Sequence, residues 1–330
     1  MKQPWMKRSG ALALAAILLT GSAGALFGKK EAPAEPAEGA PLARNMEITT
    51  YRDIPYEAQF LASDSEGDDM TYALAEEPRR GTVTIEGVNF TYTPKAGAVG
   101  GDSFTYTATD SSGNVSQPAT VTVKIEKTRS GVTYSDTEGS SAAAAAQALA
   151  ESGVFTGVRM GDRYYFEPDR TVSRSEFLAM ALETAGEEVT GVTMTGFCDD
   201  AAIPTWAKAY AAAGVAKGIV QGKTTADGAA FCGKEAITFN EAATVLDRVL
   251  NLGDVDLQVW YADRETVPSW AAQAVGNMEA LQVLQTGSFG SQTMEQAVTR
   301  GEAAKMLAAA RTLLEGEQPQ SLLDLLQKKN

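Results

Sequence analysis

Ser173-Arg174-Ser175-Glu176 closes a block of sequence that occurs three times in the C-terminal part of the chain. The closing tetrads of the other two copies are Thr238-Phe239-Asn240-Glu241 and Thr299-Arg300-Gly301-Glu302, which places the three glutamates 65 and 61 residues apart. Each copy opens with an aromatic-x-Asp triplet, and these triplets end at Asp136, Asp199 and Asp263. A repeat that keeps both of its ends in register is one structural unit used three times, so this repeat decides the fold.

The three units span residues 130–190, 191–254 and 255–315. They contain alanine-rich runs with Leu, Val and Met at helical spacing, so each unit is predicted to be a helix, a loop and a second helix. The last residues, 316–330, are predicted to form a short amphipathic tail.

The closing tetrad has the sequence of a helical capping box, in which Ser or Thr and a Glu three residues later each bind a backbone N–H of the other. These helix starts are expected at Ser173 with Glu176, Thr238 with Glu241, and Thr299 with Glu302. A helix N-terminus favours negative charge through its free N–H groups and its dipole. Arg174 and Arg300 follow the cap directly, and a guanidinium there can bind a carboxylate through two hydrogen bonds. The alternative is a plain helix start with a solvated arginine, and repetition in register favours the binding site.

Residues 1–25 have the pattern of an export signal. Three basic residues lie among the first eight, an apolar stretch follows, and Ala23-Gly24-Ala25 provides a cleavage site. The apolar stretch is shorter than the roughly twenty residues that a membrane anchor needs. Residues 26–42, rich in Pro, Ala and Glu, are expected to be an extended linker. We therefore expect a secreted protein with no membrane segment after cleavage.

The chain has a formal net charge of −14 and contains no histidine. Cleavage after Ala25 removes three basic residues and no acidic one, which makes the net charge −17. Such a charge repels nucleic acid at long range, so no nucleic-acid partner is expected. The lack of histidine in the sequence excludes Ser-His-Asp and Cys-His nucleophiles and every His-ligated metal site, and no cofactor is expected.

Cys198 and Cys232 are the two cysteines of the sequence, and both lie in the second unit. In an exported protein a disulfide between them is favoured over the alternative of two small buried thiols. The sequence leaves the distance between the two residues open, and that distance decides whether they can be joined.

Asp64, Glu66 and Asp68 have the i, i+2, i+4 spacing of the ligands in an EF-hand loop. Asp69 stands where that loop needs glycine, and Ala75 stands where it needs the bidentate glutamate. A solvated turn is therefore favoured over a weak Ca²⁺ site, and no metal site is predicted.

From residue 43 to 127 apolar and polar residues alternate, as in Phe104-x-Tyr106 and Val121-x-Val123. Turn signals rich in Gly and Asp separate six or seven short strands of this kind, which predicts a β-sandwich. Gly81-Thr82-Val83 and Gly101-Asp102-Ser103-Phe104-Thr105-Tyr106 belong to stretches that resemble the bacterial Ig-like or cadherin-like modules of extracellular proteins. The resemblance implies the fold and says little about activity.

Further positions match between the helical units. They include Trp206 and Trp270, Gly157 and Gly222, the turn Gly218-Ile219-Val220-Gln221-Gly222, and the step Phe166-Glu167-Pro168. Together with the opening triplets and closing tetrads they resemble the S-layer homology domain. The resemblance implies three units around a pseudo-threefold axis, with grooves between neighbours. It also implies a ligand, which is an anionic secondary cell-wall polysaccharide that often bears pyruvyl ketals.

The residues that the resemblance points to as the polysaccharide site are Arg174, Arg300, Trp206, Trp270, Gly157 and Gly222. A ketal-linked pyruvate is a compact carboxylate, which suits an arginine, and a tryptophan offers a face for a sugar ring. Core packing is the alternative role for both tryptophans. The units also depart from the family pattern: the second has Phe239 in place of Arg, the first has no Trp, and the third lacks the glycine pair. One or two working grooves are therefore expected.

We expect a non-enzymatic surface protein that the three units attach to the cell wall while the sandwich is displayed. Other surface-layer subunits are expected as further partners. One alternative is a self-assembling lattice subunit, and another is a cell-wall hydrolase with its catalysis in the sandwich. Nothing in the sequence pairs two carboxylates as a glycosidase requires, which disfavours the hydrolase.

Overall fold

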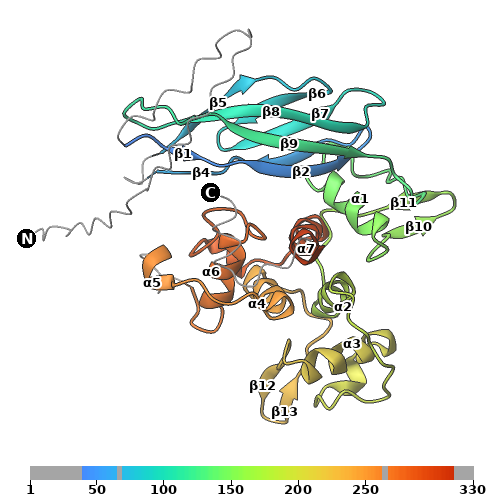
Figure 1. The fold of residues 1–330 in the computed structure, drawn as a ribbon. Coiled ribbons are helices and arrows are strands. Elements are labelled where there is room, and N and C mark those ends of the chain that lie inside the picture. Colours follow the sequence, from blue (N-terminus) through green and yellow to red (C-terminus); the bar gives the residue numbers. More distant parts are fainter. Residues whose placement is uncertain (1–38, 65–68, 262–266, 316–330) are drawn as a thin grey trace, which may run out of the picture. The chain divides into compact units, whose positions relative to one another are not determined.

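The computed structural model describes residues 39–64, 69–261 and 267–315. The expected export signal, nearly all of the expected linker and the C-terminal tail lie outside these ranges, as do Glu66, Asp68 and Asp263. Figure 1 shows that the described residues form a part built of strands and a part built mostly of helices. None of the helices within the described ranges is both long and apolar enough to span a bilayer.

Residues 42–126 form a β-sandwich, as the alternating sequence predicts. The larger sheet has the strand order β2-β9-β8-β5, and the smaller sheet has the order β3-β7-β6. Strand β2 runs parallel to β9, whereas the other neighbours in the two sheets are antiparallel. A separate short pair joins β1 to β4. The strands are β1 (Leu42–Ala43), β2 (Met46–Tyr51), β3 (Tyr56–Gln59), β4 (Ala62–Ser63), β5 (Thr71–Glu76), β6 (Gly81–Glu86), β7 (Asn89–Pro94), β8 (Gly100–Thr109) and β9 (Ala119–Glu126).

Alternate residues of β7, β8 and β9 form the sandwich core, and its largest side chains are aromatic. Tyr92 and Tyr106 are fully buried, and each hydroxyl group has a partner. The Tyr92 hydroxyl donates to Oδ2 of Asp102 at 2.8 Å, and the Tyr106 hydroxyl donates to the carbonyl of Leu61 at 2.7 Å. Gly81 leaves room for the Tyr92 ring, because a Cβ at this position would lie 2.4 Å from it. The core thus buries a large apolar surface while both buried hydroxyl groups keep a hydrogen-bond partner.

The helical part contains, among its described residues, six helices of nine or more residues, two from each predicted unit. A short β-hairpin separates the two helices of the first unit and of the second unit, where only a loop was predicted. The helices are α1 (Ala143–Glu151), α2 (Arg174–Thr184), α3 (Thr205–Ala216), α4 (Phe239–Leu250), the one-turn α5 (Leu257–Trp260), α6 (Ala272–Ala280) and α7 (Arg300–Glu315), with 3₁₀ turns at Asp200–Ala202 and Gln292–Glu295. The hairpins are β10 (Val158–Met160) with β11 (Arg163–Tyr165) and β12 (Lys223–Thr225) with β13 (Gly228–Ala230).

The helices of all three units share one hydrophobic core. The first helix of each unit packs on the second helix of another unit: α3 on α2, α6 on α4, and α1 on α7. Each unit therefore completes its core with a neighbour, because its own two helices do not cover each other's apolar faces.

A closed ring of backbone hydrogen bonds joins the three units at their helix starts. The N–H of Val172 donates to the carbonyl of Val298 at 2.9 Å, Val298 donates to Ile237 at 2.8 Å, and Ile237 donates back to Val172 at 3.0 Å. Each residue directly precedes an N-cap, and each is at most 2% exposed. The apolar residue before the capping box therefore pairs a unit with its neighbour.

The aspartate of the opening triplet fixes the loop that leads to the second helix. Asp136 accepts hydrogen bonds from the N–H groups of Phe166 and Glu167 at 2.8 and 2.7 Å. Asp199 binds the equivalent N–H groups of the second unit at 2.7 and 2.8 Å. Carboxylates that accept two backbone N–H groups form strong, charge-assisted bonds, so the triplet and the loop are held as one piece.

Candidate functional site

Each closing tetrad forms a reciprocal capping box. At α2 the hydroxyl group of Ser173 accepts from the N–H of Glu176, and the Glu176 carboxylate accepts from the N–H of Ser173. Thr238 with Glu241 at α4, and Thr299 with Glu302 at α7, make the same pair of bonds.

The remaining N–H groups at these helix starts already have acceptors in the protein. At α2 the N–H of Arg174 donates to the carbonyl of Glu235 at 2.9 Å, and that of Ser175 donates to Gly233 at 3.0 Å. The first two N–H groups of α7 likewise donate to carbonyls, at 2.7 and 2.8 Å. Because the cap occupies the third, neither helix start offers free N–H groups to a ligand. The expectation of an anion site built from backbone is therefore wrong at α2 and α7.

Arg300 is enclosed by the protein rather than offered to a ligand. Only 4% of the residue is exposed. Its NH1 donates to the carbonyl of Phe166 at 2.7 Å and lies 2.9 Å from Oε2 of Glu167. The guanidinium also lies over the ring of Phe155, with Cζ 5.0 Å from the ring centre. These contacts tie the third unit to the first and leave little of Arg300 exposed, so its expected contact with the polysaccharide stays a prediction.

Arg174 makes a similar link between the first and second units, but it borders open space. Its Nε donates to the carbonyl of Phe231 at 3.0 Å, and its NH1 lies 2.7 Å from Oε1 of Glu241. Its side chain remains 11% exposed and lines a pocket. Of the two arginines that the tetrads suggest, the structure therefore brings one to a ligand-sized space.

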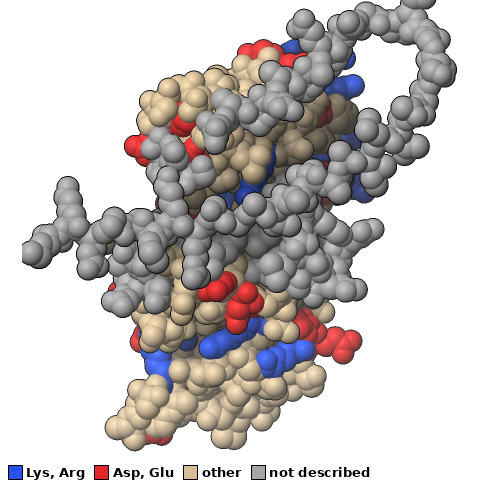
Figure 2. Space-filling model, turned by 60° about the vertical axis from the view of Figure 1, so that its left-hand side comes forward, with Lys and Arg blue, Asp and Glu red and all other residues tan. Residues whose placement is uncertain are grey.

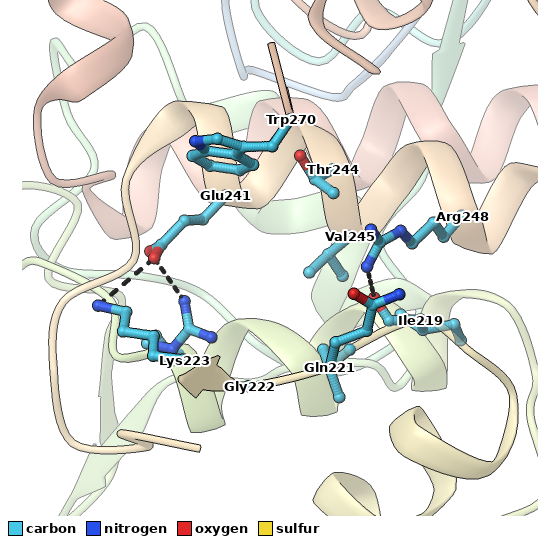
Figure 3. Close-up of a pocket in the computed structure, with 11 residues that line it drawn as sticks. Ile219, Gln221, Gly222, Lys223, Glu241, Thr244, Val245, Arg248 and Trp270 are labelled. Carbon is cyan, nitrogen blue, oxygen red and sulfur yellow. Dashed lines mark hydrogen bonds and ion pairs between the residues drawn. The ribbon is translucent and has the colours of Figure 1, made fainter. Parts of the chain in front are cut away.

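This pocket lies between α4, the turn that follows α3, and Trp270 of the third unit (Figure 3). Its volume is about 390 Å³, which is within the range of small-molecule sites. Residues 219–223 supply one wall. The α4 residues that line it are spaced by three and four along one helix face and are Glu241, Thr244, Val245 and Arg248.

The pocket is basic although the chain is acidic. Arg174, Lys223 and Arg248 line it together with one carboxylate, that of Glu241. The Nζ atom of Lys223 lies 3.6 Å from Oε1 of Glu241 and 2.6 Å from Oε2 of Glu235. Its hydrogen bond to Glu235 raises the pKa of Lys223 above its ordinary value. Figure 2 shows basic side chains gathered beside acidic ones on one face of the helical part.

Trp206 and Trp270 are surface residues, with exposed fractions of 51% and 58%. These fractions exclude the alternative of core packing for either residue. Trp270 lines the pocket, whereas Trp206 is not among the residues that line it and packs edge-on against Tyr210. The two tryptophans therefore differ in their surroundings, although their sequence positions correspond.

Gly157 and Gly222 both have positive φ angles, of 70° and 78°, and both are tightly packed. A Cβ at Gly157 would lie 2.3 Å from the carbonyl oxygen of Tyr165, and one at Gly222 would lie 2.7 Å from the ring of Phe197. Only Gly222 lines the pocket. A Cβ at Gly157 would also lie 3.3 Å from the ring of Tyr134, so both glycines pack against the aromatic residue of an opening triplet, and at Gly222 this close packing also shapes the pocket wall.

Lys223 and Arg248 line the pocket without having been expected there. Lys223 directly follows Gly222, and Arg248 lies seven residues after Glu241, so two helical turns bring it onto the same face of α4. This spacing is the available sequence signal. It does not say which face of α4 borders a pocket, because the packing of α6 and the turn at 219–223 decides that.

The remaining candidate residues do not form the expected sites. Cys198 and Cys232 are free thiols, so the favoured disulfide is not formed, and burial raises the pKa of Cys232. Of the three calcium candidates only Asp64 is described, since Glu66 and Asp68 lie outside the described residues. Within the described ranges no three acidic or cysteine side chains are grouped so as to hold a metal ion.

Two known domain families match the sequence. Residues 38–124 match the bacterial Ig domain, and residues 133–178 match the S-layer homology domain. The chain therefore carries a bacterial Ig domain followed by an S-layer homology domain. Because S-layer homology domains bind cell-wall polymers, this domain indicates a cell-surface protein that is associated with the cell wall.

Likeness to solved structures is weak. The endo-fucoidan hydrolase MfFcnA4 from glycoside hydrolase family 107 is 22% identical over 28% of this chain and 14% of that chain, with a TM-score of 0.24. A mutant of the SrpA adhesin from Streptococcus sanguinis is 18% identical over 29% of this chain and 61% of that chain, with a TM-score of 0.22. The fibronectin(III)-like modules of Clostridium thermocellum CbhA are 14% identical over 27% and 47%, with a TM-score of 0.20. The chain spans less than two thirds of each of these structures, and no curated protein matches it.

Proposed function

We propose that this protein is attached non-covalently to the bacterial cell wall, where its helical part binds an anionic secondary cell-wall polysaccharide and the Ig domain is displayed. The observation that carries the proposal is the pocket beside α4, which combines three cations with an exposed indole in a chain of net charge −14. The cations favour acidic groups on the polymer, and the indole offers a flat apolar face to a sugar ring.

The proposed ligand within the polymer is a sugar that bears a ketal-linked pyruvate. A volume of about 390 Å³ suits one or two sugar rings rather than a longer chain, so the pocket is proposed to bind a terminal or branching residue. The pyruvate adds a carboxylate that does not titrate near neutral pH, which matches a permanently charged guanidinium group in the pocket.

We also propose that all three helical units are S-layer homology repeats around a pseudo-threefold axis. The cyclic hydrogen bonds between Val172, Ile237 and Val298 support this arrangement, as does the pairing of each first helix with the second helix of another unit. The equivalent roles of Asp136 and Asp199 support a common fold for the first two units.

The residue after the N-cap, at position 174, 239 or 300, lies at the contact between two units. Of these three contacts, we propose that only the one at Arg174 binds the polymer. At the contact that contains Arg300, the guanidinium is already bound to the carbonyl of Phe166 and the carboxylate of Glu167. The position of Phe239 has no guanidinium to offer. The role of the protein is proposed to be attachment and display without catalysis.

Co-sedimentation with purified wall sacculi tests this function. The full chain is expected to pellet with untreated sacculi and to stay in solution with sacculi from which mild acid has removed ketal-linked pyruvate. Trp270→Ala is expected to weaken binding about two- to tenfold, because an aromatic contact contributes on the order of 0.5–1.5 kcal/mol.

Trp206→Ala is the matched control, since it removes a similarly exposed indole that does not line the pocket. It is expected to sediment like the unaltered chain. Equal binding to sacculi with and without pyruvate would contradict the proposed ligand, and equal loss in both tryptophan variants would contradict the proposed pocket.

A further inference from the structure

Two of the three cations in the pocket already have acidic partners within the protein. Arg174 is paired with Glu241 at 2.7 Å. Lys223 is paired with Glu235 at 2.6 Å and lies 3.6 Å from Glu241. An acidic ligand that approached these two cations would have to compete with carboxylates that are held in place.

Arg248 differs from both. Among the described residues no carboxylate lies within ion-pair distance of it, and its one polar partner is the carbonyl of Ile219, to which NH1 donates at 2.9 Å. The residue is exposed to solvent. Figure 3 shows Arg248 on the opposite side of the pocket from Glu241, with Val245 between them and Trp270 above Glu241.

We infer that Arg248, rather than the tetrad arginine Arg174, binds the acidic group of the wall polymer. This inference rests on the proposed function and adds the residue that recognises the negative charge of the ligand. The bond to Ile219 holds one edge of the guanidinium, so the other N–H groups are oriented before the ligand arrives. A carboxylate can then take two parallel hydrogen bonds without first displacing an acidic side chain.

The corresponding positions in the other two units lack this feature. Arg248 lies ten residues after the N-cap Thr238, and the same step leads to Glu183 in α2 and to Ala309 in α7. Glu183 accepts a hydrogen bond from the hydroxyl group of Tyr210 at 2.6 Å. A carboxylate there repels an acidic sugar, and an alanine offers no donor. We therefore expect one acid-binding site in each chain.

A pair of small probes isolates the charge of the ligand. The first is a methyl hexoside whose 4,6-ketal is formed by pyruvate, and the second carries an isopropylidene ketal, in which a methyl group replaces the carboxylate. Isothermal titration of the full chain gives the dissociation constant for each probe and the number of sites. We expect one site and a preference for the acidic probe of about tenfold or more, as charged hydrogen bonds commonly provide.

In Arg248→Gln the ratio of the dissociation constants of the neutral and the acidic probe is expected to fall to about one, while the dissociation constant of the neutral probe stays the same. Arg248→Lys keeps the charge but loses the planar fork, so it is expected to restore part of the preference. Arg159→Gln is the control for net charge, because Arg159 is an exposed arginine of the β10–β11 hairpin and does not line the pocket. It is expected to keep the full preference.

The result separates this inference from the function on which it rests. A chain that binds the acidic probe as tightly after Arg248→Gln as before overturns the role of Arg248 and leaves wall binding intact. A chain that binds neither sacculi nor either probe overturns both. Circular dichroism of each variant shows that a lost preference does not come from a lost fold.

Discussion

Arg174 and Glu241 lie at the starts of two different helices, α2 and α4, and their side chains meet with NH1 2.7 Å from Oε1. Glu241 also accepts the N–H of Thr238 and so completes its own capping box. One carboxylate therefore caps a helix and neutralises the arginine of the preceding unit. The arginine that the tetrad places at a helix start is thus a link between units before any ligand is present.

The first prediction concerns the strength of that link. Arg174→Gln leaves Glu241 without its closest cation in a partly buried place, and we expect a loss of about 1–3 kcal/mol in the free energy of unfolding. Urea denaturation measures it. Arg170→Gln removes a half-exposed arginine that also pairs with carboxylates, and it is expected to cost less than about 1 kcal/mol. Equal losses in the two variants would show that the ion pair between units stabilises the fold no more than an exposed ion pair does.

The second prediction concerns the opening triplet. Asp199→Ala leaves the N–H groups of Phe231 and Cys232 without their acceptor, so we expect a destabilisation of about 2–4 kcal/mol by thermal or urea unfolding. Asp227→Ala, at an exposed hairpin position of the same unit, is expected to change stability by less than about 0.5 kcal/mol. If Asp199→Ala unfolds no more easily than Asp227→Ala, the carboxylate of the opening triplet does not hold the loop in place.

The third prediction separates backbone strain from steric fit in one turn. Gly218 and Gly222 have similar φ angles, 72° and 78°, but a Cβ at Gly218 meets nothing within 4 Å. Gly218→Ala is therefore expected to cost only the left-handed strain of about 1–2 kcal/mol. Gly222→Ala adds a clash with Phe197 and Ala230, so it is expected to cost more and to weaken binding of the wall polymer. Comparable stability and binding in the two variants would rule out a special fit at Gly222.

The fourth prediction concerns acid. Hydrogen bonds from Lys208 and Thr195 lower the pKa of Asp200 to about 2, from its ordinary value of 3.8. A carboxyl group whose pKa is lowered by folding stabilises the fold above its unfolded pKa and loses that effect as the pH falls through its folded pKa. Asp200→Asn is therefore expected to melt below the unaltered chain near neutral pH. The gap is expected to narrow between about pH 4 and pH 2, and a gap that is the same at every pH would contradict the assignment.

Much of the architecture follows from local sequence patterns. Alternation in residues such as Phe104 and Tyr106 predicts strands, since neighbouring side chains of a strand point to opposite faces. The Ser or Thr and Glu of the closing tetrads predict helix starts, because both partners of a capping box lie within four residues. The hairpins between the helices were not predicted. Strands β10 to β13 are three residues each, which is too short to show the alternation of apolar and polar residues that indicates a strand.

The sequence by itself determined the two kinds of domain, the repeat, and the helix starts, because each is encoded by residues a few positions apart. Only the tertiary structure decided which cations are available to a ligand. The sequence singles out Arg174 and Arg300, which follow an N-cap, and not Arg248; in the structure the first is paired with Glu241, the second is enclosed with Glu167, and the third faces open solvent. The reason is physical: whether a charge is free depends on neighbours brought together across as many as 134 residues of chain, and a local sequence pattern does not show which neighbours these are.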